Sequence, residues 1–237
     1  MCAIAVMAKA PRAGRSKTRL CPPLTPEAAG ALSGAFIQDI TANLALVAAD
    51  GVVAPYVAYA PGGSEALFDG LLAAGTGLVL ADGEIGETPG VEGFGRCLLH
   101  AMQALFAAGF GGVCVLNSDS PSLPTRYLRQ AAERLMAGEA VLGAAEDGGY
   151  YLLGLRAAHA GMFEGIAWST GGVAAATRAR ARALGLRLEE LPAWYDVDDA
   201  AALRRFVAEA GPLPYKAPIS RAAIGRLGVA AMLEAAG

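Results

Sequence analysis

Short apolar runs alternate along this chain with longer segments in which apolar residues recur at helical spacing. The short runs predict strands buried on both faces, over residues 2–8, 52–60, 77–81, 113–116, 140–145, 150–155 and 186–191. The helical spacing predicts helices over residues 26–49, 65–73, 96–108, 123–136, 172–184, 197–208 and, as one helix or two, 219–236. Strands that alternate with helices indicate βαβ units and a mainly parallel sheet.

Two interruptions of this pattern bear on the architecture. Residues 146–149 leave no room for a crossover helix, so one antiparallel or bent element is expected within an α/β fold. Gly211, Pro212 and Pro214 break the chain before its tail. We therefore expect one α/β domain over residues 1–210 and a C-terminal extension over 211–237. This extension would serve as a lid or an oligomer contact, and its apolar helix suits a homodimer.

Composition excludes several classes of protein. Hydrophobic residues make up 54% of the 237 residues and charged residues 17%, which is enough apolar material for a large core. The net charge of -3 shows no basic footprint, so no nucleic-acid partner is expected. The longest uncharged stretch, 97–118, contains His100, Gln103 and glycines, so no membrane span is expected. The start of the chain lacks the pattern of a signal peptide, which makes a cytoplasmic location the default. The four cysteines form no C-x-x-C pair, which argues against a structural zinc site.

Asp119 is the first candidate for chemistry. It follows the apolar run 113–116 and precedes Pro121, so it stands just past the carboxyl end of a predicted central strand. Ligands bind at that edge of open α/β sheets, and a carboxylate there suits a hard divalent cation. The alternative is that Asp119 caps the helix beginning near residue 123.

The loop 9–20 is the second candidate. It carries five cations (Lys9, Arg12, Arg15, Lys17 and Arg19) between the first strand and the first helix. Arginine and lysine at this place can neutralise phosphate charge, although the loop lacks the P-loop pattern. The alternative is a solvated basic loop.

Two late acidic segments complete the candidates. Glu146 and Asp147 precede two glycines that permit close approach of a ligand, but Asp-Gly is also a hairpin signal. Asp196 and Asp198 precede the helix expected from residue 197, and either could simply cap it.

Together these segments resemble the GT-A-type nucleotide-diphospho-sugar transferase superfamily. The resemblance covers roughly residues 3–206. It rests on K-x-P-x-x-G-x-x-K-T-R-L at 9–20, S-D-S-P-x-L at 118–123 and A-E-D-G-G-Y-Y-L-L-G-L at 145–155, supported by Trp168-Ser169-Thr170 and Asp196-Val197-Asp198-Asp199. The chain looks most similar to the bacterial selenodomain-associated transferases, which are related to molybdenum-cofactor and 2-phospholactate guanylyltransferases. This resemblance implies a three-layer α/β/α sandwich with a mainly parallel mixed sheet.

The resemblance also implies roles for individual residues. Asp119 matches the metal-binding aspartate, with Asp196 and Asp198 as further ligands of Mg²⁺ or Mn²⁺. Asp147 lies where relatives place a second, substrate-binding acid, so Asp119 and Asp147 are the expected catalytic residues. The expected nucleotide- and phosphate-binding residues are Lys9, Gly14, Lys17, Thr18 and Arg19. One departure from the family pattern is at Arg96, which is shifted by one position and so inherits no site role.

Three functions remain open from the sequence. The first is a metal-dependent, glycosyltransferase-like enzyme that takes a nucleotide-diphospho-sugar donor and an unknown small-molecule acceptor. The second is a nucleotidyltransferase of the guanylyl- or cytidylyltransferase kind that takes a nucleoside triphosphate, which the very basic loop suits. The third is a non-catalytic nucleotide-binding module.

Overall fold

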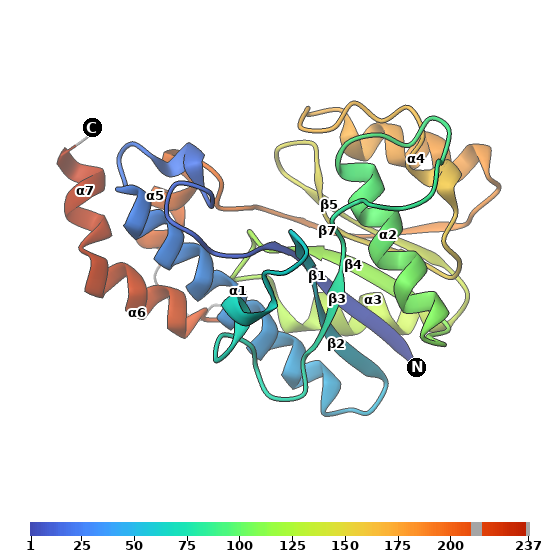
Figure 1. Ribbon diagram of the computed structural model, residues 1–237, viewed down its shortest axis with the longest axis horizontal. Helices are drawn as coiled ribbons and strands as arrows, with labels where there is room; N and C mark the ends of the chain where they lie inside the picture. The colour runs from blue at the N-terminus through green and yellow to red at the C-terminus, as the bar shows by residue number, and fades with distance from the viewer. Residues whose placement is uncertain (210–214, 236–237) are drawn as a thin grey trace.

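One seven-stranded mixed sheet forms the centre of the protein (Figure 1). The computed structural model describes residues 1–209 and 215–235. The sheet has the order β3-β2-β1-β4-β6-β5-β7. Its strands are β1 (Cys2–Lys9), β2 (Val53–Ala60), β3 (Gly77–Leu80), β4 (Val113–Asn117), β5 (Ala140–Ala145), β6 (Tyr150–Leu155) and β7 (Leu188–Trp194). Within the described sheet, only β6 runs antiparallel to its neighbours, which confirms the expected mainly parallel arrangement.

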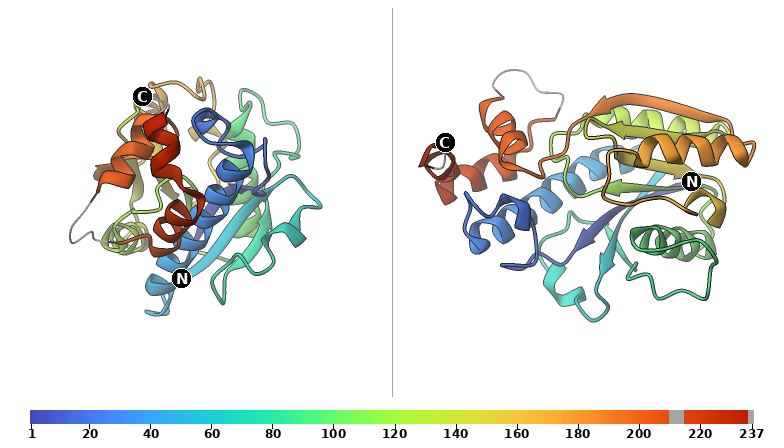
Figure 2. Two further views of the ribbon diagram at one scale, coloured as in Figure 1. Left: turned by 90° about the vertical axis from the view of Figure 1, so that its left-hand side faces the viewer. Right: turned by 90° about the horizontal axis from the view of Figure 1, so that it is seen from above.

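Helices cover both faces of this sheet, which gives the expected three layers (Figures 1 and 2). The helices of the described residues are α1 (Pro26–Ala48), α2 (Phe94–Ala107), α3 (Thr125–Met136), α4 (Val173–Ala183), α5 (Ala200–Ala208), α6 (Pro218–Leu227) and α7 (Val229–Ala235), and of these α1 to α4 pack against the sheet. Helices α1 and α3 bury Ile40 and Leu128 on one face, while α2 buries Leu98 and Met102 on the other.

The first long helix begins where the sequence predicts. Thr25 accepts a hydrogen bond from the amide of Ala28 at 3.2 Å, and Pro26 occupies the first turn. Among the described residues, α1 is the one helix long and apolar enough to cross a membrane, but 61% of its apolar window is buried inside the protein. A core helix of this kind is weak evidence for a membrane span.

Helices α5 to α7 lie beside α1 and away from the sheet (Figure 1). Phe36 of α1 and Phe206 of α5 meet edge to face, with ring centroids 5.9 Å apart. The buried carboxylate of Asp39 accepts hydrogen bonds from the amides of Ile219 at 3.2 Å and Ser220 at 2.6 Å, which caps the start of α6. The described part of the tail therefore packs on α1. The expected boundary at Gly211 lies outside the described residues, so the division into a domain and an extension stays a prediction.

Several expected boundaries differ from the structure. The helix expected over 65–73 is a single 3₁₀ turn, Glu65–Phe68, because Gly70 takes a positive φ of 71°. The last strand extends to Trp194 through its pairing with Ala145. The tail forms two helices because Gly228, at φ 65°, ends α6; residue 236 of the expected tail helix lies outside the described residues.

Candidate functional site

Six strands of the described sheet are parallel and end at one edge, and four of them lead into the segments that carry the candidate residues. They are β1 at Lys9, β4 at Asn117, β5 at Ala145 and β7 at Trp194. Because carboxyl ends of parallel strands share one edge, the loops that follow bring together the basic loop, Asp119, the 146–149 turn and the 195–199 segment. The sequence motifs thus converge as expected from the strand order.

The basic loop is held in a fixed shape by its own backbone and by one buried serine. The amide of Arg12 donates to Ser16 Oγ at 3.1 Å, and this hydroxyl donates to the carbonyl of Ala10 at 3.4 Å. The next residue, Lys17, has a left-handed backbone with φ 51° and ψ 41°. Such a conformation is costly for a residue with a side chain and occurs often at functional sites.

Lys17 joins two of the three acids, Asp119 and Asp198, that the resemblance implied as metal ligands. Its Nζ lies 2.6 Å from Asp119 Oδ1 and 2.7 Å from Asp198 Oδ1, and it also donates to the carbonyl of Val197 at 2.8 Å. The Lys17 side chain is 6% exposed, whereas those of Asp119 and Asp198 are 29% and 37% exposed. Burial lowers the pKa of Lys17, but the two carboxylates outweigh this effect and raise it above its usual value, so Lys17 is a buried ammonium ion.

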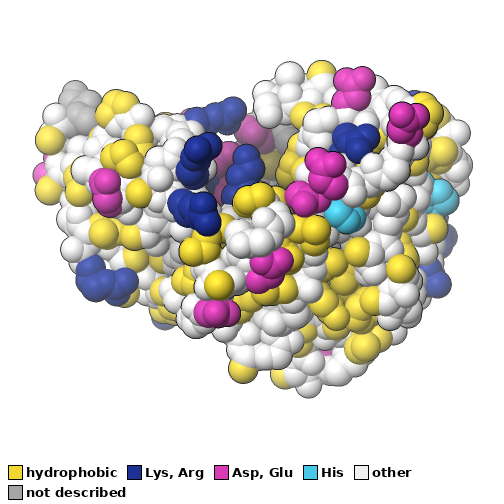
Figure 3. All heavy atoms as spheres, in the orientation of Figure 1, with side chains coloured by type: hydrophobic (Ala, Val, Ile, Leu, Met, Phe, Trp, Pro, Cys, Tyr) yellow, Lys and Arg dark blue, Asp and Glu magenta, His cyan; other side chains and the backbone are white. Residues whose placement is uncertain are grey.

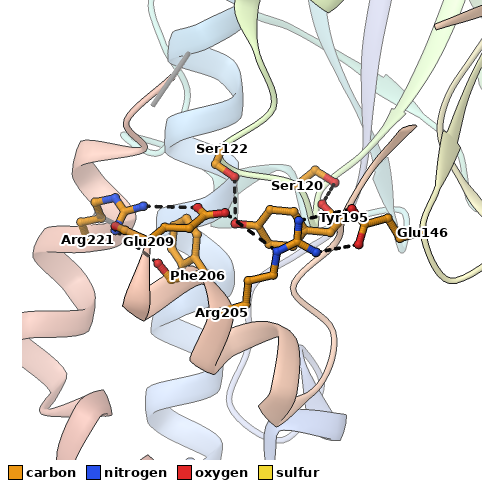
Figure 4. Close-up of polar contacts among 8 residues, drawn as sticks. All are labelled: Ser120, Ser122, Glu146, Tyr195, Arg205, Phe206, Glu209 and Arg221. Carbon is orange, nitrogen blue, oxygen red and sulfur yellow. Dashed lines mark hydrogen bonds and ion pairs between the residues drawn. The ribbon is translucent and has the colours of Figure 1, made fainter. Parts of the chain in front are cut away.

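Hydrogen bonds clamp the 195–199 segment onto the loop after β4. Val197 donates its amide to the carbonyl of Asp119 at 2.8 Å. Ser120 Oγ donates to the carbonyl of Tyr195 at 3.0 Å, and Ser122 Oγ donates to the Tyr195 hydroxyl at 3.3 Å (Figure 4). These bonds fix the distance between Asp119 and Asp198 although the two residues are 79 positions apart in the chain.

Arg205 extends this clamp to the third acidic segment. Its guanidinium lies 3.8 Å from the centroid of the Tyr195 ring and holds both carboxylate oxygens of Glu146 at 2.6 and 3.2 Å (Figure 4). Bidentate pairing of this kind gives orientation as well as attraction. Helix α5 thereby fixes the turn that carries Asp147.

Asp147 and Asp196 lie at the margin of the acid pair. Asp147 is exposed, and its Oδ1 accepts the amide of Gly149 at 2.8 Å, so the turn expected at 146–149 is confirmed. Burial, followed by the negative charges of Asp147 and Asp198, raises the pKa of Asp196 to about 6. Asp147 and Asp196 thus add negative charge near the cluster that Lys17 forms with Asp119 and Asp198.

A cavity of about 340 Å³ opens beside this cluster. Figure 3 shows basic side chains gathered around a hollow with acidic side chains visible inside it. Lys9, Arg15, Lys17, Thr18 and Arg19 line the cavity together with Asp119 and Asp198. Its remaining wall is largely apolar, formed by residues such as Ala58, Ala60, Ala81 and Phe94. Charged groups on one side and an apolar wall on the other suit a ligand with a phosphate and a flat ring.

The structure decides between several alternatives left open by the sequence. Asp119 does not cap the following helix, since α3 begins at Thr125 with Pro124 at its cap position. Neither Asp196 nor Asp198 caps α5; Asp199 does, accepting the amide of Ala202 at 2.8 Å.

Most of the expected site residues meet here, with differences in position. Lys9, Lys17, Thr18, Arg19, Asp119 and Asp198 border the cavity; Gly14, Asp147 and Asp196 are not part of its lining. Gly14 supplies a left-handed turn at φ 70°. Arg96 bonds the carbonyls of Gly83 and Ile85 at 3.1 and 2.9 Å, which holds the loop before α2. Tyr195 adjoins the candidate acids in the sequence, but the sequence indicated no role for it. Arg205 was not predicted as a site residue, and its only signal is that it follows the acids at 196 and 198.

We expect Asp196 to destabilise the fold as it ionises. Its folded pKa of about 6 exceeds the unfolded value of roughly 3.9, so the unfolding free energy falls as pH rises between these values. Solvent screening weakens this effect because Asp196 is partly exposed. Asp196→Asn should therefore raise the unfolding free energy of the metal-free protein by about 1 kcal/mol at pH 8 and by almost nothing at pH 4. Urea unfolding in a chelating buffer measures this difference, with Asp69→Asn on the exposed surface as the matched control. Equal effects at both pH values would contradict it.

The fold is that of the nucleotide-diphospho-sugar transferases. A protein from Desulfovibrio desulfuricans G20, named "putative nucleotide-diphospho-sugar transferase", is 26% identical with a TM-score of 0.82, over 98% of this chain and 96% of its own. CMP:2-keto-3-deoxy-manno-octonic acid synthetase in complex with CTP is 14% identical with a TM-score of 0.52, over 86% of this chain and 95% of its own, which shows the fold alone. The first likeness confirms the superfamily indicated by the motifs and supports a transferase-like function.

The chain belongs to the family described as "Uncharacterized protein conserved in bacteria (DUF2064)", whose pattern matches residues 43–170. No curated protein matches the chain significantly.

Proposed function

We propose that the protein is a cytoplasmic, metal-dependent transferase that acts on a nucleotide-activated substrate, with a nucleotide-diphospho-sugar as donor. One observation carries this proposal: Asp119 and Asp198 face a common cation at the wall of a cavity that Lys9, Arg15, Lys17 and Arg19 also line. Binding of a diphosphate with its metal ion needs acids that hold the metal and cations that hold the phosphates. Both kinds of residue occur at this cavity.

The acid pair suits Mg²⁺ or Mn²⁺ by its chemistry. Both ions prefer oxygen ligands and need only one or two carboxylates when substrate phosphates complete the coordination. Asp119 and Asp198 already converge on one positive charge, so they would hold the ion. Within residues 1–209 and 215–235 no group of three metal-binding side chains exists. Asp196 would therefore lie near the ion without being one of its two principal ligands. When bound, such an ion neutralises charge on the departing diphosphate.

The remaining roles follow from position. The exposed cations of the basic loop would bind the phosphates. They would also stabilise the negative charge that develops on the leaving group, which is an electrostatic contribution to catalysis. Asp147 is exposed, carries its charge near Asp196 and is held in place through Glu146 and Arg205, and it would orient the acceptor or remove its proton. The apolar wall around Phe94 would take the base.

A nucleotidyltransferase is the second candidate. Its support is the number of cations on one cavity wall, since a triphosphate carries more charge to neutralise than a diphosphate. In that reaction a phosphate-bearing acceptor would attack the α-phosphorus of a nucleoside triphosphate.

Thermal unfolding with Mn²⁺ and a panel of nucleoside triphosphates and nucleotide sugars separates the two. A ligand at 100 times its dissociation constant adds about 2.7 kcal/mol of stability. The proposal expects stabilisation by at least one nucleotide sugar, dependent on Mn²⁺. Stabilisation by a triphosphate and by no nucleotide sugar favours the second candidate, and no response to any nucleotide contradicts both.

A further inference from the structure

The ammonium of Lys17 is already engaged by three protein groups. It donates hydrogen bonds to Asp198 at 2.7 Å and to the carbonyl of Val197 at 2.8 Å, and it forms an ion pair with Asp119 at 2.6 Å, which leaves at most one of the three N–H donors of a lysine for a ligand. The ring of Phe36 lies 5.3 Å from Nζ and closes a further side. A phosphate contact through more than one N–H donor of Lys17 therefore requires this side chain to leave the acids.

The same position conflicts with a divalent ion. A divalent ion bound by Asp119 and Asp198 would compete with the Lys17 ammonium for the same two carboxylates. Two cations this close together would also repel each other. Removal of Lys17 without a replacement leaves two partly buried carboxylates uncompensated. The acid pair is thus stable with one cation at a time.

The cavity offers Lys17 a second partner. Lys17 lines it together with Arg15 and Arg19 of the same loop, and a lysine has a flexible stem that can redirect its charge. A phosphate bound by those arginines would lie within the reach of a displaced Lys17. The left-handed backbone of Lys17 is costly, which is consistent with a residue placed for function.

From these contacts we propose that Lys17 is a built-in counter-ion that excludes a bare divalent ion from Asp119 and Asp198 until a phosphate ligand draws it away. The inference rests on the proposed function and deepens it, since it makes metal and nucleotide bind cooperatively. Because coupling between two ligands is reciprocal, the metal must strengthen nucleotide binding by the same factor as the nucleotide strengthens metal binding.

The first test measures Mn²⁺ alone, by the electron paramagnetic resonance signal of the free ion. Lys17→Met should bind Mn²⁺ about tenfold or more tightly than the natural protein, because the competing charge is gone. Lys17→Gln, which removes the charge but keeps N–H donors, should do the same and guards against poor folding of the first variant. Arg19→Met, from the same cavity wall, should change the affinity for Mn²⁺ less than about twofold, since the ion pairs of Asp119 and Asp198 in the described structure are with Lys17 and not with Arg19.

The second test titrates a preformed complex of Mn²⁺ and inorganic pyrophosphate by calorimetry. The natural protein should bind this complex more tightly than it binds Mn²⁺, and Lys17→Met should bind it more weakly than the natural protein does. If Lys17→Met binds Mn²⁺ alone more tightly but binds the complex of Mn²⁺ and pyrophosphate more weakly, Lys17 acts as a displaced counter-ion. An unchanged or weaker affinity of both Lys17 variants for Mn²⁺ alone overturns the inference and leaves the proposed function standing. A natural protein that binds neither the complex nor any nucleotide with Mn²⁺ overturns both.

Discussion

Asparagine in place of Asp119 is expected to abolish the Mn²⁺-dependent part of nucleotide binding. The change keeps the shape of the side chain and removes the charge that faces Lys17 at 2.6 Å. Loss of groups that merely support a metal ligand costs ten- to a hundredfold in affinity, so loss of the ligand itself should cost roughly 100-fold or more. Calorimetric titration of the stabilising nucleotide, with Mn²⁺ and with a chelator, measures the loss.

Two variants make this result specific. Asp198→Asn should weaken the metal-dependent binding in the same way, because both acids face the same cation. Asp69→Asn, at an exposed position outside the cavity lining, should leave it unchanged. Normal Mn²⁺-dependent binding by a folded Asp119→Asn protein would mean that Asp119 only anchors Lys17.

Alanine in place of Gly148 is expected to cause a large loss of stability. Gly148 has φ 90°, and a Cβ on it would lie 2.0 Å from the carbonyl oxygen of Gly171. The clashing oxygen belongs to the backbone and not to a movable side chain. The clash can therefore be relieved only if the turn after β5 separates from the loop before α4. We expect a loss of about 3 kcal/mol or more in urea unfolding, from strain and overpacking together.

Gly165→Ala is the matched control for the clash. Gly165 has a similarly positive φ of 64° but no atom within 4 Å of the added Cβ, so it should lose only about 1 kcal/mol from backbone strain. Equal losses at the two positions would show that the contact between Gly148 and Gly171 relaxes freely. Because Asp147 precedes Gly148, we also expect the folded fraction of Gly148→Ala to bind nucleotide more weakly.

The sheet could be predicted from the sequence because its signals are local. The apolar run 113–116 predicts a central strand, and the short 146–149 connection predicts one antiparallel or bent element. The structure has the strand β4 and, after the connection, the antiparallel strand β6. The common position of the acids also follows, since parallel strands present their carboxyl ends at one edge. The prediction of a helix over 65–73 was wrong, because Gly70 takes a positive φ and turns the chain after a single 3₁₀ turn.

The pairing inside the site could not be predicted, because it depends on contacts across the chain. Lys17 and Asp198 are 181 residues apart, and nothing near either residue identifies the other as its partner. Lys17 therefore seemed from the motif to be a phosphate contact, whereas its ammonium is bound to the acids. Arg205 was missed for the same reason: its partners Tyr195 and Glu146 become neighbours only when α5 folds back over the turn.

The most direct measurement is the anomalous scattering of Mn²⁺ in crystals grown with the nucleotide that stabilises the protein most. We predict a manganese peak in contact with carboxylate oxygens of Asp119 and Asp198 and with phosphate oxygens of the nucleotide. We also predict that Lys17 has turned away from both acids toward the phosphates. A bound nucleotide with no manganese at these acids, and with Lys17 still between them, would contradict it.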